Sequence, residues 1–235
     1  MRLPWLTSSA PFPELARALL SPNGLLCAGA DLSVERLKAA YAQGIFPWFN
    51  DGEPILWWSP DPRCVLIPAA LALSKRDWRT LRASGWEVRS DTQFPKVLDQ
   101  CAAPRANYFG AGTWLSHEMQ DAYYTLHAAG AAHSVEVFDG QELIGGIYGV
   151  AAGGVFCGES MFGARSNASK AALVALVLGL ERMGFGVLDC QVRSQHLADR
   201  GAKEIPRASF QAMLTEFKAE KSWQSGVWVE PWRIR

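Results

Sequence analysis

The segment Ala168–Met183 most constrains how this chain can fold, because its apolar residues run nearly all the way round a helix. A helix with one apolar stripe can lie on a surface, whereas a helix that is apolar all round must be buried. Asn167 or Ser166 is a suitable N-cap, and Gly184 and Gly186 lead from the helix into a further strand. The pattern predicts a long helix inside the core of a domain.

Runs with strand character flank this helix on both sides. His133–Phe138 and Glu142–Val150 enclose the turn residues 139–140, an Asp-Gly pair that is typical of a β-hairpin. Val155–Phe162 precedes the helix, and Val187–Val192 follows it. Strands joined by short turns, with helices between some of them, predict an α+β fold with a mixed, largely antiparallel sheet.

The first part of the chain differs in composition from the rest. Residues 1–62 contain most of the prolines and one clear helix, which starts after the N-cap Ser33 and stops at Gly44. The run Ser59–Pro62 marks a boundary. We therefore predict a small N-terminal domain over residues 1–62 and a larger domain over residues 63–235.

Composition narrows the class of protein. Lys and Arg total 23, as do Asp and Glu, so the formal net charge of zero indicates no polyanionic partner for the molecule as a whole. Five cysteines without close pairs and four histidines without metal-ligand spacing argue against a disulfide framework and a zinc site. The chain has neither a cleavable signal nor an apolar run long enough for a membrane span. We expect a cytoplasmic protein without a membrane partner.

Two polar residues interrupt the apolar run Val187–Val192. Asp189 and Gln191 are two positions apart, and such residues point to the same face of a strand. Polar groups on a buried strand are costly unless they are paired. The pair is therefore either a hydrogen-bonded core pair or a carboxylate and an amide that handle a proton in a substrate pocket.

A second carboxylate favours the pocket. Glu159 and Met161 share one face of the predicted strand Val155–Phe162, where Phe156 and Phe162 are apolar neighbours. A carboxylate framed in this way is expected to be half-buried. Together the three polar groups predict a cleft with one apolar wall and one catalytic wall.

A short predicted helix carries a basic face. Ser74 and Asp77 have the spacing of a capping box, which marks the start of the helix. Cations in the first turn lie near the positive end of the helix dipole, so they do not stabilise the helix. The face is therefore either a solvated surface or a contact for the phosphates of a small nucleic acid such as a tRNA acceptor stem. Its members are Lys75, Arg76, Arg79 and Arg82.

Two segments of the chain could be compared with phosphate-binding loops, and neither has the features of one. Gly145–Gly149 lies in the predicted hairpin rather than at a strand-to-helix turn, so no helix N-terminus is available to a phosphate. Arg165–Lys170 precedes the long helix but lacks the glycines of a coenzyme A pyrophosphate loop. These observations disfavour a nucleotide-binding loop and a coenzyme-A-dependent acyltransferase.

Several long runs resemble signature runs of the bacterial leucyl/phenylalanyl-tRNA–protein transferase family, in the family's order and spacing. The resemblance extends over nearly the whole chain and is weakest at residues 1–20, 85–110 and 220–235. The runs are Pro22–Leu26, Gly44–Phe49, Leu56–Arg63, Phe156–Phe162 and Asp189–Val192.

The resemblance implies a small N-terminal domain followed by a domain of the GCN5-related acetyltransferase type. It implies transfer of Leu or Phe, with Met as a further candidate, from aminoacyl-tRNA to the α-amine of proteins that begin with Arg or Lys. The product would be marked for N-end rule degradation. We expect a monomer. The alternatives are a coenzyme-A-dependent N-acyltransferase and a non-catalytic tRNA-binding protein.

The resemblance also implies roles for individual residues. Glu159, Asp189 and Gln191 match the polar catalytic positions, and the basic helix matches the tRNA-facing cluster. The positions that match the aminoacyl and terminal-adenosine pocket are Tyr41, Trp48, Trp114, Tyr123, Ile147, Met161 and Leu188.

The chemistry predicts that no cofactor is required. Aminolysis of an ester is downhill, so neither ATP nor a metal is needed. A neutral amide is a weak base, so our hypothesis is that the Gln191 carbonyl oxygen orients the attacking amine. Asp189 would fix that amide and stabilise positive charge on the nucleophile. Glu159 would hold the adenosine or the basic acceptor residue.

Overall fold

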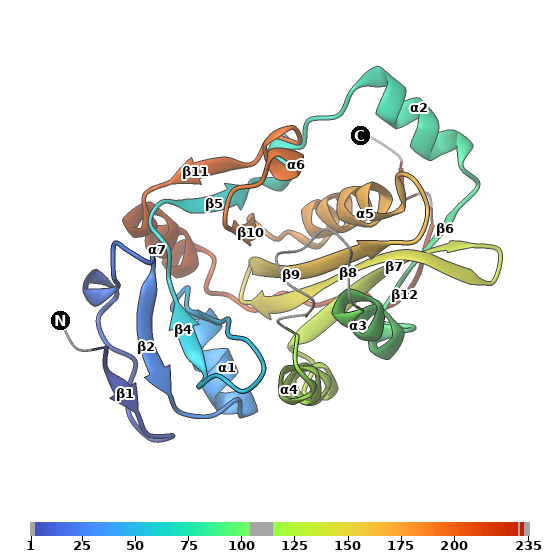
Figure 1. Ribbon diagram of the computed structural model, residues 1–235. Helices are drawn as coiled ribbons and strands as arrows, with labels where there is room; N and C mark the ends of the chain where they lie inside the picture. The colour runs from blue at the N-terminus through green and yellow to red at the C-terminus, as the bar shows by residue number, and fades with distance from the viewer. Residues whose placement is uncertain (1–2, 104–114, 230, 233–235) are drawn as a thin grey trace.

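The computed structural model describes residues 3–103, 115–229 and 231–232, and it contains two β-sheets (Figure 1). The smaller sheet has the strand order β1-β2-β4-β3 and the larger one β11-β5-β10-β9-β8-β7-β6-β12. The strands of the smaller sheet are β1 (Trp5–Leu6), β2 (Leu25–Gly29), β3 (Phe46–Pro47) and β4 (Leu56–Trp58). Those of the larger sheet are β5 (Arg63–Leu66), β6 (Glu87–Ser90), β7 (Ala132–Asp139), β8 (Glu142–Ala152), β9 (Val155–Gly163), β10 (Val187–Gln191), β11 (Lys203–Ile205) and β12 (Gly226–Trp228).

The larger sheet is mostly antiparallel. The predicted hairpin is present as β7 and β8, and β8 pairs antiparallel with β9. Among the strand pairs of this sheet in the described residues, β9 and β10 are the only parallel pair. The helix over residues 168–183 connects these two strands as a crossover. The prediction of an α+β fold with a mixed, largely antiparallel sheet is confirmed.

Helices cover both faces of this sheet. In Figure 1, α5 lies on one face and α3 and α4 lie on the other. The basic helix α2 stands beyond α5 at the edge of the molecule (Figure 1). The helices are α1 (Val34–Tyr41), α2 (Lys75–Ala83), α3 (Phe94–Ala102), α4 (His117–Ala128), α5 (Ala168–Met183), α6 (Gln195–Ala198) and α7 (Arg207–Glu216), with 3-10 turns at Leu15–Arg17 and Pro68–Ala70.

Helix α5 is the core helix that the sequence predicts. Its buried residues run almost without a break from Ala168 to Leu180. Each fully buried Val or Leu side chain contributes about 1.5–3 kcal/mol relative to its exposed state. Asn167 occupies the N-cap position in a left-handed conformation, with φ of 67°, but its side chain makes no capping hydrogen bond. Gly184, with φ of 78°, ends the helix, so burial rather than capping fixes α5.

One hydrophobic core reaches from the smaller sheet into the larger one. Trp57 of β4, Val65 of β5 and Tyr123 of α4 belong to the same buried cluster. The two sheets are divided between β4 and β5, close to the boundary expected from the sequence. The shared core does not test whether residues 1–62 fold as a separate domain, so that boundary stays a prediction.

Within the described ranges, no helix combines the length and apolar character that crossing a bilayer would require.

Candidate active site

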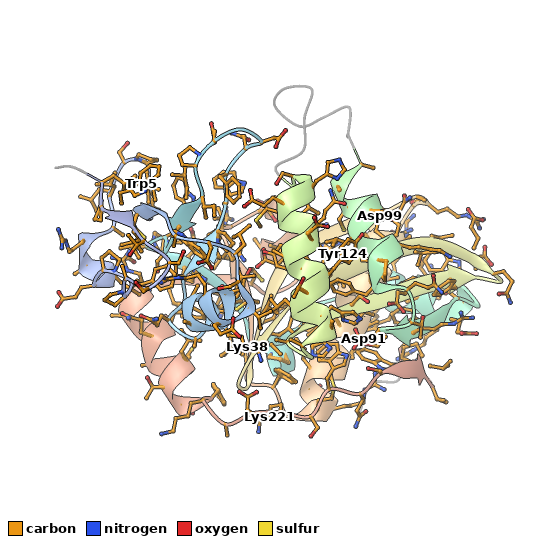
Figure 2. All side chains as sticks on the ribbon, turned by 90° about the horizontal axis from the view of Figure 1, so that it is seen from below. Trp5, Lys38, Asp91, Asp99, Tyr124 and Lys221 are labelled. Carbon is orange, nitrogen blue, oxygen red and sulfur yellow. The ribbon has the colours of Figure 1, made fainter. Side chains whose placement is uncertain are left out.

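The polar residues predicted for the site come together where four elements meet. Glu159 lies on β9, and Asp189 and Gln191 lie on the neighbouring strand β10. Tyr41 ends α1, and Tyr123 lies on α4. Seen from below, α4 lies between α1 and α3, which explains how these two tyrosines meet (Figure 2).

Asp189 is fully buried and forms an ion pair with Arg63 of β5. The Arg63 guanidinium donates from Nε to Oδ1 at 2.8 Å and from Nη2 to Oδ2 at 2.6 Å, a two-pronged geometry that only arginine provides. Its Nη1 donates to the Gly44 carbonyl oxygen at 3.1 Å. The rings of Phe46 and Phe210 lie 5.0 and 4.7 Å from the guanidinium carbon. Every side of this cation is therefore engaged.

Arg63 is a site residue that the sequence interpretation missed. Its signal was present, because Arg63 ends the signature run Leu56–Arg63 and begins an otherwise apolar strand. Burial opposes its charge, but the Asp189 carboxylate outweighs burial and raises the pKa of the guanidinium. Asp189 is thus a paired structural anion rather than a free base.

A β-bulge in β10 changes the expected orientation of Gln191. The register with β5 shifts between Asp189 and Gln191, and Gln191 has φ of 60°. The simple alternation of strand side chains therefore does not extend past Asp189. The Gln191 backbone N–H donates to Asp189 Oδ1 at 2.9 Å, whereas its side-chain Nε2 donates to Glu159 Oε1 at 2.8 Å. The prediction that Asp189 fixes the Gln191 amide is therefore wrong, because the bulge turns the amide to Glu159 and leaves Asp189 to fix the backbone of Gln191.

Glu159 sits in a triangle of hydrogen bonds with two buried tyrosines. Tyr41 donates to Oε1 and Tyr123 donates to Oε2, each at 2.8 Å. The two phenolic oxygens are 2.7 Å apart. Burial is the largest cause that raises the pKa of both tyrosines well above the ordinary value, and Glu159 adds to it, so both phenols stay protonated.

The neutral and ionised forms of Glu159 are close in free energy near pH 7. Burial raises the pKa of Glu159 to about 7, against the hydrogen bonds from Tyr123 and Tyr41, and the Asp189 charge adds to the rise. The triangle has three oxygen–oxygen contacts, two between a phenol and Glu159 and one between the phenols. When Glu159 is ionised, the two phenolic protons serve the contacts with Glu159, and the contact between the phenolic oxygens has no proton. A protonated Glu159 supplies the third proton. This network therefore titrates in the physiological range.

A cavity of about 100 Å³ opens beside these groups. Its polar end is formed by Glu159, Asp189 and Gln191, and its apolar wall includes the predicted residues Ile147, Met161 and Leu188. The sequence interpretation missed Leu173 of α5 and Leu197 of α6, because their patterns match ordinary core residues. The remaining lining residues are Gly158, Ser160 and Cys190.

The other predicted pocket residues differ in position. Tyr41 and Tyr123 reach the site through Glu159 and are not among the cavity-lining residues. Trp48 lies on the surface, 49% exposed, with its ring 5.5 Å from that of Trp58, and does not line the cavity. Trp114 lies outside the described residues.

The basic cluster is present as predicted on α2. Lys75, Arg76, Arg79 and Arg82 are all exposed. Ser74 and Asp77 form the capping box, and Leu81 is buried, so the helix is anchored without using its cations. Asp77 also accepts from Lys170 of α5 at 2.6 Å. Arg82 lies over the Trp78 ring, 5.6 Å from its centroid, and all four cations remain exposed to solvent on a helix of fixed position.

The fold also assembles a histidine cluster that the spacing in the sequence did not reveal. Ligand atoms of Asp91, His127 and His133 lie within 4.8 Å of one another. Asp91 accepts from His133 Nδ1 at 2.8 Å, from the Ser134 backbone N–H at 2.8 Å and from the Ser225 hydroxyl at 2.9 Å. Because the carboxylate is already engaged and none of the three lines the cavity, we assign this cluster to the packing of β7.

Two carboxylates and an amide at the polar end of an apolar cavity, set between strands of a mixed sheet, are typical of an enzyme site that binds an apolar group beside the reacting atoms. A family model described as leucyl/phenylalanyl-tRNA protein transferase matches residues 65–215, and the model of its N-terminal domain matches residues 30–61. The chain belongs to the leucyl/phenylalanyl-tRNA–protein transferase family.

Individual relatives agree with the family models. The leucyl/phenylalanyl-tRNA–protein transferase of Nitrosospira multiformis is 55% identical over 214 residues, which cover 91% of each chain. That of Nitrosomonas europaea is 53% identical over 214 residues, covering 91% of this chain and 90% of the relative. Among solved structures, L-PGS from Bacillus licheniformis matches with a TM-score of 0.39 and 12% identity, over 82% of this chain and 63% of that one.

Proposed function

We propose that this protein transfers Leu or Phe from aminoacyl-tRNA to the N-terminal α-amine of proteins that begin with Arg or Lys. The observation that carries the proposal is the cavity whose apolar wall meets Glu159 and Gln191 at its polar end. The apolar wall suits an uncharged side chain such as Leu or Phe. The polar end suits an ester carbonyl and an amine.

In the proposed reaction, the amine nitrogen attacks the ester carbonyl carbon. A C–N bond forms, the C–O bond to the ribose breaks, and the amine loses a proton while the ribose oxygen gains one. The acceptor amine has an ordinary pKa near 8, so part of it is neutral at pH 7. Holding it about 3 Å from the carbonyl contributes several kcal/mol.

Gln191 is the group we assign to positioning the amine. Its Nε2 donates to Glu159, so its carbonyl oxygen is left to accept from the attacking amine. Arg63 and Asp189 hold the backbone of Gln191 in its left-handed conformation. Glu159 therefore orients the amide, in addition to any contact with adenosine or with the basic acceptor residue. The vicinal ribose hydroxyl of the donor is our candidate for relaying the proton.

The wider assignment rests on the family. We infer a monomeric, cytoplasmic enzyme that needs no cofactor and whose products enter N-end rule degradation. Trp48, with its exposed indole, is suited to stack on the terminal adenine. Trp114 remains a proposed pocket residue on the resemblance alone.

Transfer of labelled Leu from charged tRNA to a peptide with N-terminal Arg tests the function. We expect turnover without ATP, metal or acetyl-coenzyme A, and none with a peptide that begins with Glu. Dependence on coenzyme A would instead identify an N-acyltransferase. Tight binding of charged tRNA without any transfer would identify a tRNA-binding protein.

The α2 cluster gives a separate prediction about the donor. Changing Lys75, Arg76, Arg79 and Arg82 to Ala should raise the apparent Michaelis constant for charged tRNA and flatten its dependence on salt, because fewer counterions are released on binding. Transfer from a minimal aminoacyl-adenosine, which lacks the acceptor stem, should hardly change. Equal damage with both donors would mean that α2 acts only through the fold.

A further inference from the structure

The bulge in β10 brings two cysteines of neighbouring strands together. Asp189 pairs with Val65 and Gln191 pairs with Cys64, so Cys190 is the extra residue of the bulge. In a bulge, two residues of one strand lie opposite one residue of the other. Cys190 and Gln191 therefore share Cys64 as their partner, and Cys190 packs against the same hydrophobic cluster that contains Cys64. The sequence hides this pair, because its members are far apart in the chain.

The two thiols differ in access and in reactivity. Cys190 is partly buried and lines the cavity, whereas Cys64 is 1% exposed and does not line it. A small polar molecule in the cavity reaches the Cys190 sulfur first. The contact between the two thiols lowers the pKa of Cys64 and raises that of Cys190, so Cys190 meets the peroxide through its access, and Cys64 is the better thiolate for the second step.

We propose that Cys64 and Cys190 are an oxidation site, in which a peroxide converts the two thiols into a reversible disulfide that inactivates the enzyme. The inactivation rests on the proposed transfer function, whereas formation of the disulfide does not. Neighbouring antiparallel strands have Cα atoms about 4.5–5.5 Å apart, within the range of about 4.4–6.8 Å that a disulfide spans.

The chemistry balances with one peroxide. The Cys190 sulfur attacks a peroxide oxygen, the O–O bond breaks, the thiol proton passes to the leaving hydroxide, and a sulfenic acid and one water form. The Cys64 thiolate then attacks the sulfenic sulfur, an S–S bond forms, the S–O bond breaks, and the leaving hydroxide takes up a proton as a second water. Two thiols are oxidised, and hydrogen peroxide is reduced to two waters.

The link would disturb the groups that hold Asp189. Cys64 directly follows Arg63, and Cys190 lies between Asp189 and Gln191. The sulfurs must approach to about 2.05 Å, and the bulge must shift with them. This shift changes the position of the Gln191 amide relative to Glu159, so we expect transfer to stop while the fold persists.

The test uses the full chain treated with hydrogen peroxide. We expect the intact mass to fall by two hydrogen atoms, a Cys64–Cys190 cross-linked peptide to appear in a non-reducing digest, and transfer of Leu to an N-terminal-Arg peptide to drop at least tenfold. Dithiothreitol should restore both the thiols and the activity. Circular dichroism should show that the oxidised protein stays folded.

Two alanine variants make the test specific. Cys64→Ala should keep the basal activity but form no internal disulfide, and its peroxide damage should resist dithiothreitol as Cys190 is oxidised further. Cys27 is a buried cysteine of β2, and the Cys27→Ala variant should behave like the wild type. Absence of the cross-linked peptide, or full activity of a fully cross-linked protein, would overturn the proposal. A reduced protein without any transfer activity would refute the proposed function instead, since mass and peptide mapping still report the disulfide.

Discussion

Asp189→Asn is expected to lower transfer turnover by at least about a hundredfold, and to destabilise the protein by about 3–5 kcal/mol. The substitution keeps the shape of the side chain but leaves the Arg63 cation buried without its counter-charge. It also weakens the acceptor that fixes the Gln191 backbone. Turnover per folded molecule, together with urea denaturation, measures the two effects separately. Binding of a non-hydrolysable aminoacyl-adenosine should change little.

A double variant separates the two roles of Asp189. Replacing both members of a buried ion pair by uncharged residues is often neutral for stability. Arg63→Met combined with Asp189→Asn should therefore recover most of the lost stability while turnover stays low. If the double variant recovers turnover along with stability, Asp189 contributes only to the fold, and its proposed role in positioning Gln191 is wrong.

The parts of the fold that depend on local pattern could be predicted from the sequence. Helix α5 occupies the predicted residues because its composition requires burial on all sides. The β7–β8 hairpin follows from its turn signal, although the turn residues are 140–141, one position later than predicted, because Asp139 pairs with Glu142. The capping box at Ser74 is present. In each case the signal and the structure it determines lie within a few residues of each other.

The parts that depend on pairing across the chain could not be predicted. Arg63 and Asp189 are 126 residues apart, and only the antiparallel pairing of β5 with β10 brings them together. A glycine in a strand often indicates a bulge, but the bulge after Asp189 contains none, since Gln191 itself adopts the positive φ. The partner of the Gln191 amide was therefore assigned to Asp189 from strand alternation, whereas the bulge directs the amide to Glu159.

The same bulge links the fold to the proposed chemistry. Without it, Asp189 and Gln191 would project from one face of the strand, and the Gln191 amide N–H would compete with Arg63 for the Asp189 carboxylate. With it, Arg63 takes the carboxylate and Glu159 takes the amide. Tyr41 and Tyr123 then fix Glu159 from α1 and α4, so elements from both parts of the chain determine where the Gln191 carbonyl points.

Gln191→Glu should give an enzyme whose activity relative to the wild type falls as the pH rises. The new carboxyl group lies where the amide donates to Glu159 at 2.8 Å, and two carboxylates at that distance do not both ionise readily. Burial already raises the pKa of Glu159 to about 7. A second negative charge beside it further raises the pKa at which the pair loses its last proton. At low pH the pair shares one proton, and that proton replaces the amide N–H. As the pH rises through the raised pKa, the proton is lost, the carboxylates repel, and the amine loses its aligning acceptor.

The comparison with Gln191→Ala makes this prediction decisive. Alanine provides no acceptor in any protonation state, so Gln191→Ala should be at least about a hundredfold slower than the wild type at every pH. Dividing each rate by the wild-type rate at the same pH removes the titration of the acceptor amine itself. A Gln191→Glu ratio that does not change with pH would mean that Glu159 and residue 191 are not paired during transfer. A ratio as low as that of Gln191→Ala throughout would mean that an amide N–H is essential, as a donor to the developing oxyanion, because the singly protonated pair still offers a carbonyl oxygen to the amine.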